Sequence, residues 1–123
     1  MKYLILIYTN PEMRDYWAAL TDEQRTDAAR AHTAVVDELV ASGEFVTSAP
    51  LADASHTKRF VVRDEQLHTT DGPYAEAKEH LAGFYVVDCE SVERAVEVGA
   101  KMPEAAYGMV EVRPTMSPVW MEH

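Results

Sequence analysis

The sequence predicts an α+β fold, a ferredoxin-like sandwich in which two helices cover one face of an antiparallel sheet. The expected elements follow the order β-α-β, a β-hairpin and β-α-β, which is the pattern of that fold. Each of the two main helical segments carries one apolar stripe, so each has one face to bury. The chain has 123 residues, 47% of them hydrophobic, enough for one domain over residues 1–123 whose core needs no metal or disulfide.

Turn and capping residues delimit the expected elements. Thr21 and Gln24 form a capping box at the start of a long helix, and Gly43 ends it. Ser91 caps a second helix, which stops before Pro103. In chain order, the elements are a strand at 2–9, a helical element around 13–20, a helix at 21–42, a strand at 44–49, a hairpin of strands at 57–63 and 66–70, a strand at 82–88, a helix at 91–102 and a strand at 108–113.

Two of the expected strands are apolar on both faces. The runs at 3–8 and 84–87 do not alternate polar and apolar residues, so both of their faces need burial. The helices cover only one face of the sheet. A second copy of the chain, packed sheet against sheet, would bury the other face, and we therefore predict a homodimer.

The composition argues against several function classes. A formal net charge of −10 opposes contact with nucleic acid or an anionic membrane, because phosphate groups bind positive surfaces. No apolar run reaches the length of a membrane span. The single cysteine, Cys89, cannot form an internal disulfide and fits the reducing cytoplasm, where we expect the protein. Zinc-type spacing, a glycine-rich phosphate loop and a dinucleotide motif are all missing from the sequence, so we expect no metal and no cofactor.

One histidine and one aspartate are the candidate catalytic residues. His32 lies on the apolar stripe of the long helix, one turn from Ala28 and from Val36, and Asp71 precedes a rigid Gly72-Pro73 turn. A carboxylate on one ring nitrogen fixes the tautomer of a histidine and leaves the other nitrogen to move a proton. In the alternative interpretation, His32 is a histidine at the edge of the core and Asp71 only caps its own turn.

The same turn carries a resemblance to a known family. The ordered residues are Asp71-Gly72-Pro73-Tyr74, Glu76, Lys78-Glu79, Gly83, Pro103 and Glu111-Val112-Arg113-Pro114. With them the chain resembles the YCII-like proteins, and within these the subgroup marked by an Asp-Gly-Pro-Phe (DGPF) signature, although Tyr74 replaces the usual Phe. The resemblance implies a dimeric α+β barrel and a His–Asp pair, which falls on His32 and Asp71.

Three functions remain open at this point. The first is a small cofactor-independent enzyme that moves a proton on a cyclic or aromatic-derived substrate. The resemblance suggests this, because the wider fold group includes lactone isomerases, dehydrochlorinases and small monooxygenases. The second is a ligand-binding or regulatory module linked to sigma-factor-dependent transcription, as in other relatives of the signature subgroup. The third is a structural dimer without a ligand. The residues expected to contact a substrate are Tyr74, Lys78, Tyr85 and Arg113.

Overall fold

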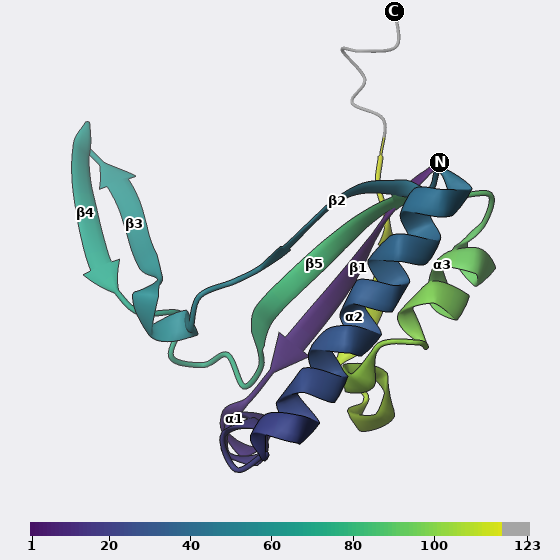
Figure 1. The fold of residues 1–123 in the computed structure, drawn as a ribbon. Helices are drawn as coiled ribbons and strands as arrows, with labels where there is room; N and C mark the ends of the chain where they lie inside the picture. The colour runs from purple at the N-terminus through teal and green to yellow at the C-terminus, as the bar shows by residue number, and fades with distance from the viewer. Residues whose placement is uncertain (117–123) are drawn as a thin grey trace, which may run out of the picture.

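The computed structural model describes residues 1–116 and contains a four-stranded antiparallel sheet with helices beside it (Figure 1). The strand order in this sheet is β2-β5-β1-β6, and a separate two-stranded sheet consists of β3 and β4. The α+β class is therefore confirmed. The elements are β1 (Lys2–Thr9), α1 (Pro11–Ala18), α2 (Asp22–Ser42), β2 (Phe45–Pro50), η1 (Ala54–His56), β3 (Lys58–Arg63), β4 (Gln66–Asp71), β5 (His80–Asp88), α3 (Val92–Gly99), η2 (Pro103–Tyr107) and β6 (Val110–Pro114).

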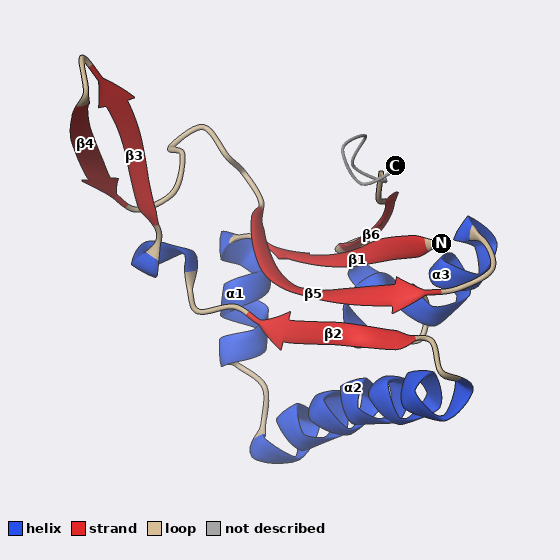
Figure 2. Cartoon of the chain, turned by 90° about the horizontal axis from the view of Figure 1, so that it is seen from above, coloured by secondary structure: helices blue, strands red, loops and turns tan. Residues whose placement is uncertain are grey.

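The core lies between the sheet and helices α2 and α3. Alternate residues of β1 and β5 point into it, and Ile5 and Val87 are completely buried there. From the helices, Leu39 of α2 and Val98 of α3 are completely buried against them. Figures 1 and 2 show both helices on the same side of the sheet. This is the one-sided coverage that the apolar stripes predict.

Helix α2 has the predicted ends. Thr21 accepts a hydrogen bond from the backbone N–H of Gln24, whose side chain accepts one from the backbone N–H of Thr21. Gly43 closes the helix with a φ of 79°, a left-handed conformation that glycine adopts without steric cost. Burial is uneven along the helix, because its buried residues, Val35 and Leu39, both lie in the second half. Val40, which was expected on the apolar stripe, is exposed.

The opposite face of the sheet has no helix over it within residues 1–116 (Figure 1). Leu4 and Leu6 of β1 lie on this face, in register with Val86 and Phe84 of β5, and all four are half-buried. The prediction that both faces of these strands are apolar is thus confirmed for the single chain. A dimeric barrel, which would cover this face, remains a prediction.

The hairpin β3–β4 stands away from the rest of the molecule in both ribbon views (Figures 1 and 2). Its turn residues, Asp64 and Glu65, have φ values of 49° and 63°, as two-residue hairpin turns require. Phe60, Val62 and Leu67 lie on one face of the hairpin and are each more than 60% exposed. The hairpin therefore presents an uncovered apolar face.

Two short elements differ from the sequence-based expectation. Helix α1 begins two residues earlier than expected, because the Asn10 side chain caps it by accepting from the backbone N–H of Met13 and Pro11 fits its first turn. After α3, where only a helix end was expected, Pro103 opens the 3₁₀ helix η2. No helix within the described residues combines the length and apolar character needed to cross a bilayer.

Candidate functional site

His32 is hydrogen-bonded through both ring nitrogens. Its Nδ1 lies 2.8 Å from the hydroxyl oxygen of Tyr85, and its Nε2 lies 2.8 Å and 3.1 Å from the two carboxyl oxygens of Glu104. The rings of His32 and Tyr85 are nearly parallel, with 12° between their planes. The three side chains come from α2, β5 and η2, so only the folded chain brings them together.

The carboxylate determines which ring nitrogen of His32 carries the proton. Burial acts to raise the pKa of Glu104, but hydrogen bonds from His32 and from the backbone outweigh burial, and the pKa is lowered. An ionised carboxylate only accepts hydrogen bonds, so Nε2 of His32 carries the proton that is donated to Glu104. In the neutral ring Nδ1 is then an acceptor, and the Tyr85 hydroxyl donates to it.

Tyr85 keeps its proton in this arrangement. Burial raises the pKa of Tyr85 above its ordinary value, and the negative charge of Glu104 raises it further. The hydroxyl is therefore the donor that Nδ1 needs. Glu104, His32 and Tyr85 form a continuous chain of hydrogen bonds from a carboxylate, through an imidazole, to a phenol. We call this chain the Glu–His–Tyr chain.

The Glu–His–Tyr chain lies in the wall of a cavity of about 380 Å³, which falls within the usual size range of small-molecule sites. The cavity is bounded by the first half of α2, where the helix buries few residues, and by the strands that face it. Most lining residues are apolar or small. The lining consists of Ile7, Ala29, His32, Ser48, Ala49, Pro50, Ala82, Gly83, Phe84, Tyr85 and Glu104.

A second cavity of about 350 Å³ adjoins the first, since Ile7, Ala82 and Glu104 line both. Arg14 and Asp53 line this second cavity, where Asp53 Oδ1 lies 3.4 Å from Arg14 Nε. Glu104 therefore lines two adjoining cavities. The first is mostly apolar, and the second contains the charged side chains of Arg14 and Asp53.

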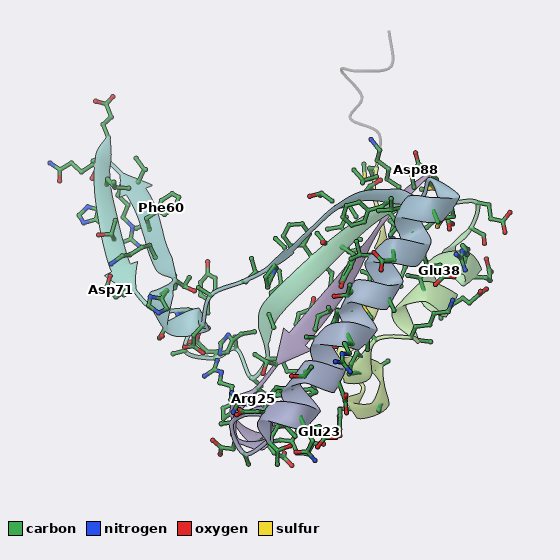
Figure 3. All side chains as sticks on the ribbon, viewed as in Figure 1. Glu23, Arg25, Glu38, Phe60, Asp71 and Asp88 are labelled. Carbon is green, nitrogen blue, oxygen red and sulfur yellow. The ribbon has the colours of Figure 1, made fainter. Side chains whose placement is uncertain are left out.

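Asp71 is not a partner of His32 within the chain. It ends β4 in the protruding hairpin, and its carboxylate pairs there with Lys58, the residue opposite it on β3 (Figure 3). The Asp71 side chain is 80% exposed. The structure thus brings a carboxylate to His32, as the sequence analysis expected, but that carboxylate is Glu104.

The other expected substrate contacts are dispersed, apart from Tyr85. Tyr74 is exposed in the loop after β4, where the guanidinium of Arg59 lies 4.1 Å from its ring centroid. Lys78 lines a separate hollow beside Tyr8. Arg113 is exposed on β6, where it lies opposite Leu4 of β1. Of the four residues, only Tyr85 belongs to the cavity that contains His32.

Sequence reasoning missed Glu104. For the secondary structure, Pro103 was interpreted as the residue that stops a helix, yet proline is also favoured in the first turn of a new helix. An acid directly after that proline, in a short segment between apolar residues, was the available signal. The distance of 72 residues between Glu104 and His32 gave no further indication.

Residues 1–116 bring no three His, Cys, Asp or Glu side chains together in a way that could hold a metal ion. Cys89 is buried, and its thiol donates to the backbone carbonyl of Ser91 at 3.4 Å. In the cavity, the Glu–His–Tyr chain supplies groups for hydrogen bonding and proton transfer.

Comparison with known proteins gives two findings. The family model described as YCII-related domain matches residues 1–117. An uncharacterized protein of Rhizobium meliloti (strain 1021) is 30% identical over 116 residues, which cover 93% of this chain and 91% of that protein. The similarity thus extends over nearly the whole of both chains.

Proposed function

We propose that this chain, which belongs to the YCII-related domain family, is a small cofactor-independent enzyme that transfers a proton on a small cyclic or aromatic-derived substrate. One observation carries the proposal. A histidine bonded to a half-buried carboxylate lies in the wall of an apolar cavity large enough for one small ring compound. An oriented imidazole is the commonest general acid or base in proteins.

In this proposal, Glu104 has the role that was expected of Asp71. It holds His32 in one tautomer and stabilises the imidazolium that forms when His32 takes up a proton. The exposed fractions of the two side chains are 24% for His32 and 18% for Glu104, so water screens their interaction only partly.

A homodimer with a barrel of two facing sheets is part of the proposal. It is supported by the open face that carries Leu6 and Phe84, and by the exposed apolar hairpin. Asp71, Tyr74, Lys78 and Arg113 remain candidate substrate contacts only in such an assembly. The turn at Asp71 also supports membership in the DGPF subgroup, and the single cysteine supports a cytoplasmic location.

A regulatory module is the second candidate function. It would bind a ligand in the same cavity without chemical change and pass the signal to a protein linked to sigma-factor-dependent transcription. The exposed apolar face of the hairpin, with Phe60, Val62 and Leu67, supports this alternative because uncovered apolar surface often marks protein contacts.

Two measurements on one probe separate these functions. Cyclohexanone is titrated into ¹⁵N-labelled protein, and its α-hydrogens are then followed by NMR for exchange in D₂O. We expect amide shifts around His32 and Ala29, together with exchange that is faster than in buffer. His32→Gln should lose the exchange, whereas the exposed His56→Gln should keep it.

The site itself is tested by blocking the cavity. Ala29→Phe places a ring at the lining of the cavity, and Ala34→Phe is the matched control, since Ala34 lies on the same helix and does not line the cavity. Binding that survives Ala29→Phe contradicts the proposed site. Binding without exchange contradicts the enzyme and favours the regulatory module.

A further inference from the structure

The Tyr85 hydroxyl has hydrogen-bonding capacity that the chain does not use. Within the described residues it makes one hydrogen bond, to Nδ1 of His32. A phenol oxygen donates one hydrogen bond and accepts up to two, so its acceptor side is free for a ligand. Tyr85 lines the same cavity as His32.

His32 has no such capacity left. One ring nitrogen faces Glu104 and the other faces Tyr85, each at 2.8 Å. A ligand in the cavity therefore cannot bond to a free nitrogen of His32 unless it displaces one of these partners. The oxygen of Tyr85 is the member of the Glu–His–Tyr chain that can exchange a proton with a ligand without breaking the chain.

We propose that the Tyr85 hydroxyl oxygen is the atom that takes the proton from the substrate, with His32 and Glu104 as a relay behind it, and that the substrate is an uncharged weak acid. This inference rests on the proposed function, because it assigns the reacting atom of the same site. Tyr85 is then a catalytic residue, and Glu104 is a positioning residue.

The proton transfer balances without a cofactor. The X–H bond of the substrate breaks and its proton forms a new O–H bond with Tyr85, while the original Tyr85 O–H bond breaks and that proton binds Nδ1 of His32. The substrate leaves as an anion, His32 becomes an imidazolium ion, and Glu104 accepts a hydrogen bond from it throughout. Tyr85 is neutral before and after, so no tyrosinate has to form in the cavity.

The charges around the cavity select an uncharged substrate. Among the described lining residues, Glu104 is the only acid and there is no lysine or arginine. Arg14 lies in the adjoining cavity, with its Nε 3.4 Å from Asp53 Oδ1, and does not line this one. A carboxylate or phosphate that enters this cavity while His32 is neutral therefore meets the negative charge of Glu104 with no cation among the described lining residues. A phenol, an enol or a carbon acid next to a carbonyl group meets no such repulsion.

The test uses 4-nitrophenol, a weak acid whose ionised form absorbs at longer wavelength than the neutral form. The probe is titrated with pH in the presence and absence of excess protein. We expect wild-type protein to lower the pH at which the probe ionises by about one unit, a tenfold change in its ionisation constant. Tyr85→Phe should bind the probe within a few-fold of wild type but return its ionisation to the value in buffer.

The control variants and a second ligand complete the design. Tyr3→Phe removes a hydroxyl from another buried tyrosine of the core and should behave as wild type. 4-Nitrobenzoate, an anion of similar size, should bind at least tenfold more weakly than 4-nitrophenol. Equal binding of the two probes overturns the inference about substrate charge.

The remaining outcomes separate the inference from the proposed function. If Tyr85→Phe ionises the probe as well as wild type does, the role of Tyr85 is overturned while the cavity and His32 stand. If wild type does not bind the probe, or if Ala29→Phe binds it equally well, the proposed site itself fails. Should Tyr85→Phe not fold, ¹⁵N spectra of His32 in wild type decide, because the relay requires Nδ1 to gain a proton when 4-nitrophenol binds.

Discussion

Replacing Glu104 by glutamine keeps the size of the side chain but removes the negative charge beside His32. In the native chain, the two carboxyl oxygens lie 2.8 Å and 3.1 Å from the same Nε2 atom, so the contacts share one N–H and count as one hydrogen bond to a charged acceptor. Such a bond contributes about 1.5–3 kcal/mol, and a neutral one contributes about 0.5–1.5 kcal/mol. We therefore expect Glu104→Gln to lower the free energy of unfolding at pH 7 by about 1–1.5 kcal/mol.

The pH dependence of this loss has a definite sign. The pKa of Glu104 is lower in the folded chain than in the unfolded chain, so its contribution to stability is complete above the unfolded value of about 4.3. The contribution decreases as the pH falls through the folded pKa, because both states are then protonated. The difference between wild type and Glu104→Gln should accordingly be largest near neutral pH and disappear in acid.

Urea unfolding of both proteins at a series of pH values between 7 and about 3 measures this difference directly. Glu97→Gln is the control, because Glu97 likewise accepts a side-chain hydrogen bond, here from the cationic Arg94, but is 62% exposed. Its effect on stability should be small at every pH. Two results would refute the assignment of Glu104 as the charged partner of His32. One is equal stability of wild type and Glu104→Gln at pH 7, and the other is a difference in stability that stays the same in acid.

Two further predictions concern the thiol and the open face of the sheet. Cys89→Ala should lower the free energy of unfolding by about 1–2 kcal/mol, because the thiol is buried and donates to a backbone carbonyl. The binding of 4-nitrophenol should be unchanged. A loss of binding at an unchanged melting temperature would instead indicate that the thiol has a role in the site. Leu6 lies on the uncovered face of the four-stranded sheet, so Leu6→Asp should convert the proposed dimer to monomers, as measured by light scattering. A wild-type chain that is monomeric at micromolar concentration would contradict the dimer proposal.

The fold was predictable where local signals and burial agree. The capping box at Thr21 and Gln24, the glycine at position 43 and the two-residue turn at Asp64–Glu65 each require a particular backbone geometry, and each is found. These signals act over three or four residues and need no tertiary information. The class of the fold followed from the order in which they occur.

The site was predictable only in part, because its geometry depends on long-range contacts. The helix pattern identified His32 as a polar residue on an apolar stripe, and Tyr85 was among the residues expected to contact a substrate. Its carboxylate partner could not be chosen by such patterns, since the sequence contains many acids and the turn at Asp71 was the most conspicuous. Burial distinguishes the two candidates, because Glu104 is 18% exposed and Asp71 is 80% exposed.

The exposed hairpin changes the role that Asp71 can have. A two-stranded hairpin is at best marginally stable by itself, and burying Phe60, Val62 and Leu67 would stabilise it by about 1.5–3 kcal/mol each. The hairpin therefore gains free energy by docking on another apolar surface, and the open sheet face of a second copy is such a surface. Because Asp71 ends β4, any contact between Asp71 and a substrate depends on that docking. A chemical role for Asp71 at this cavity would thus depend on the proposed dimer, whereas Glu104, His32 and Tyr85 are already assembled within one chain.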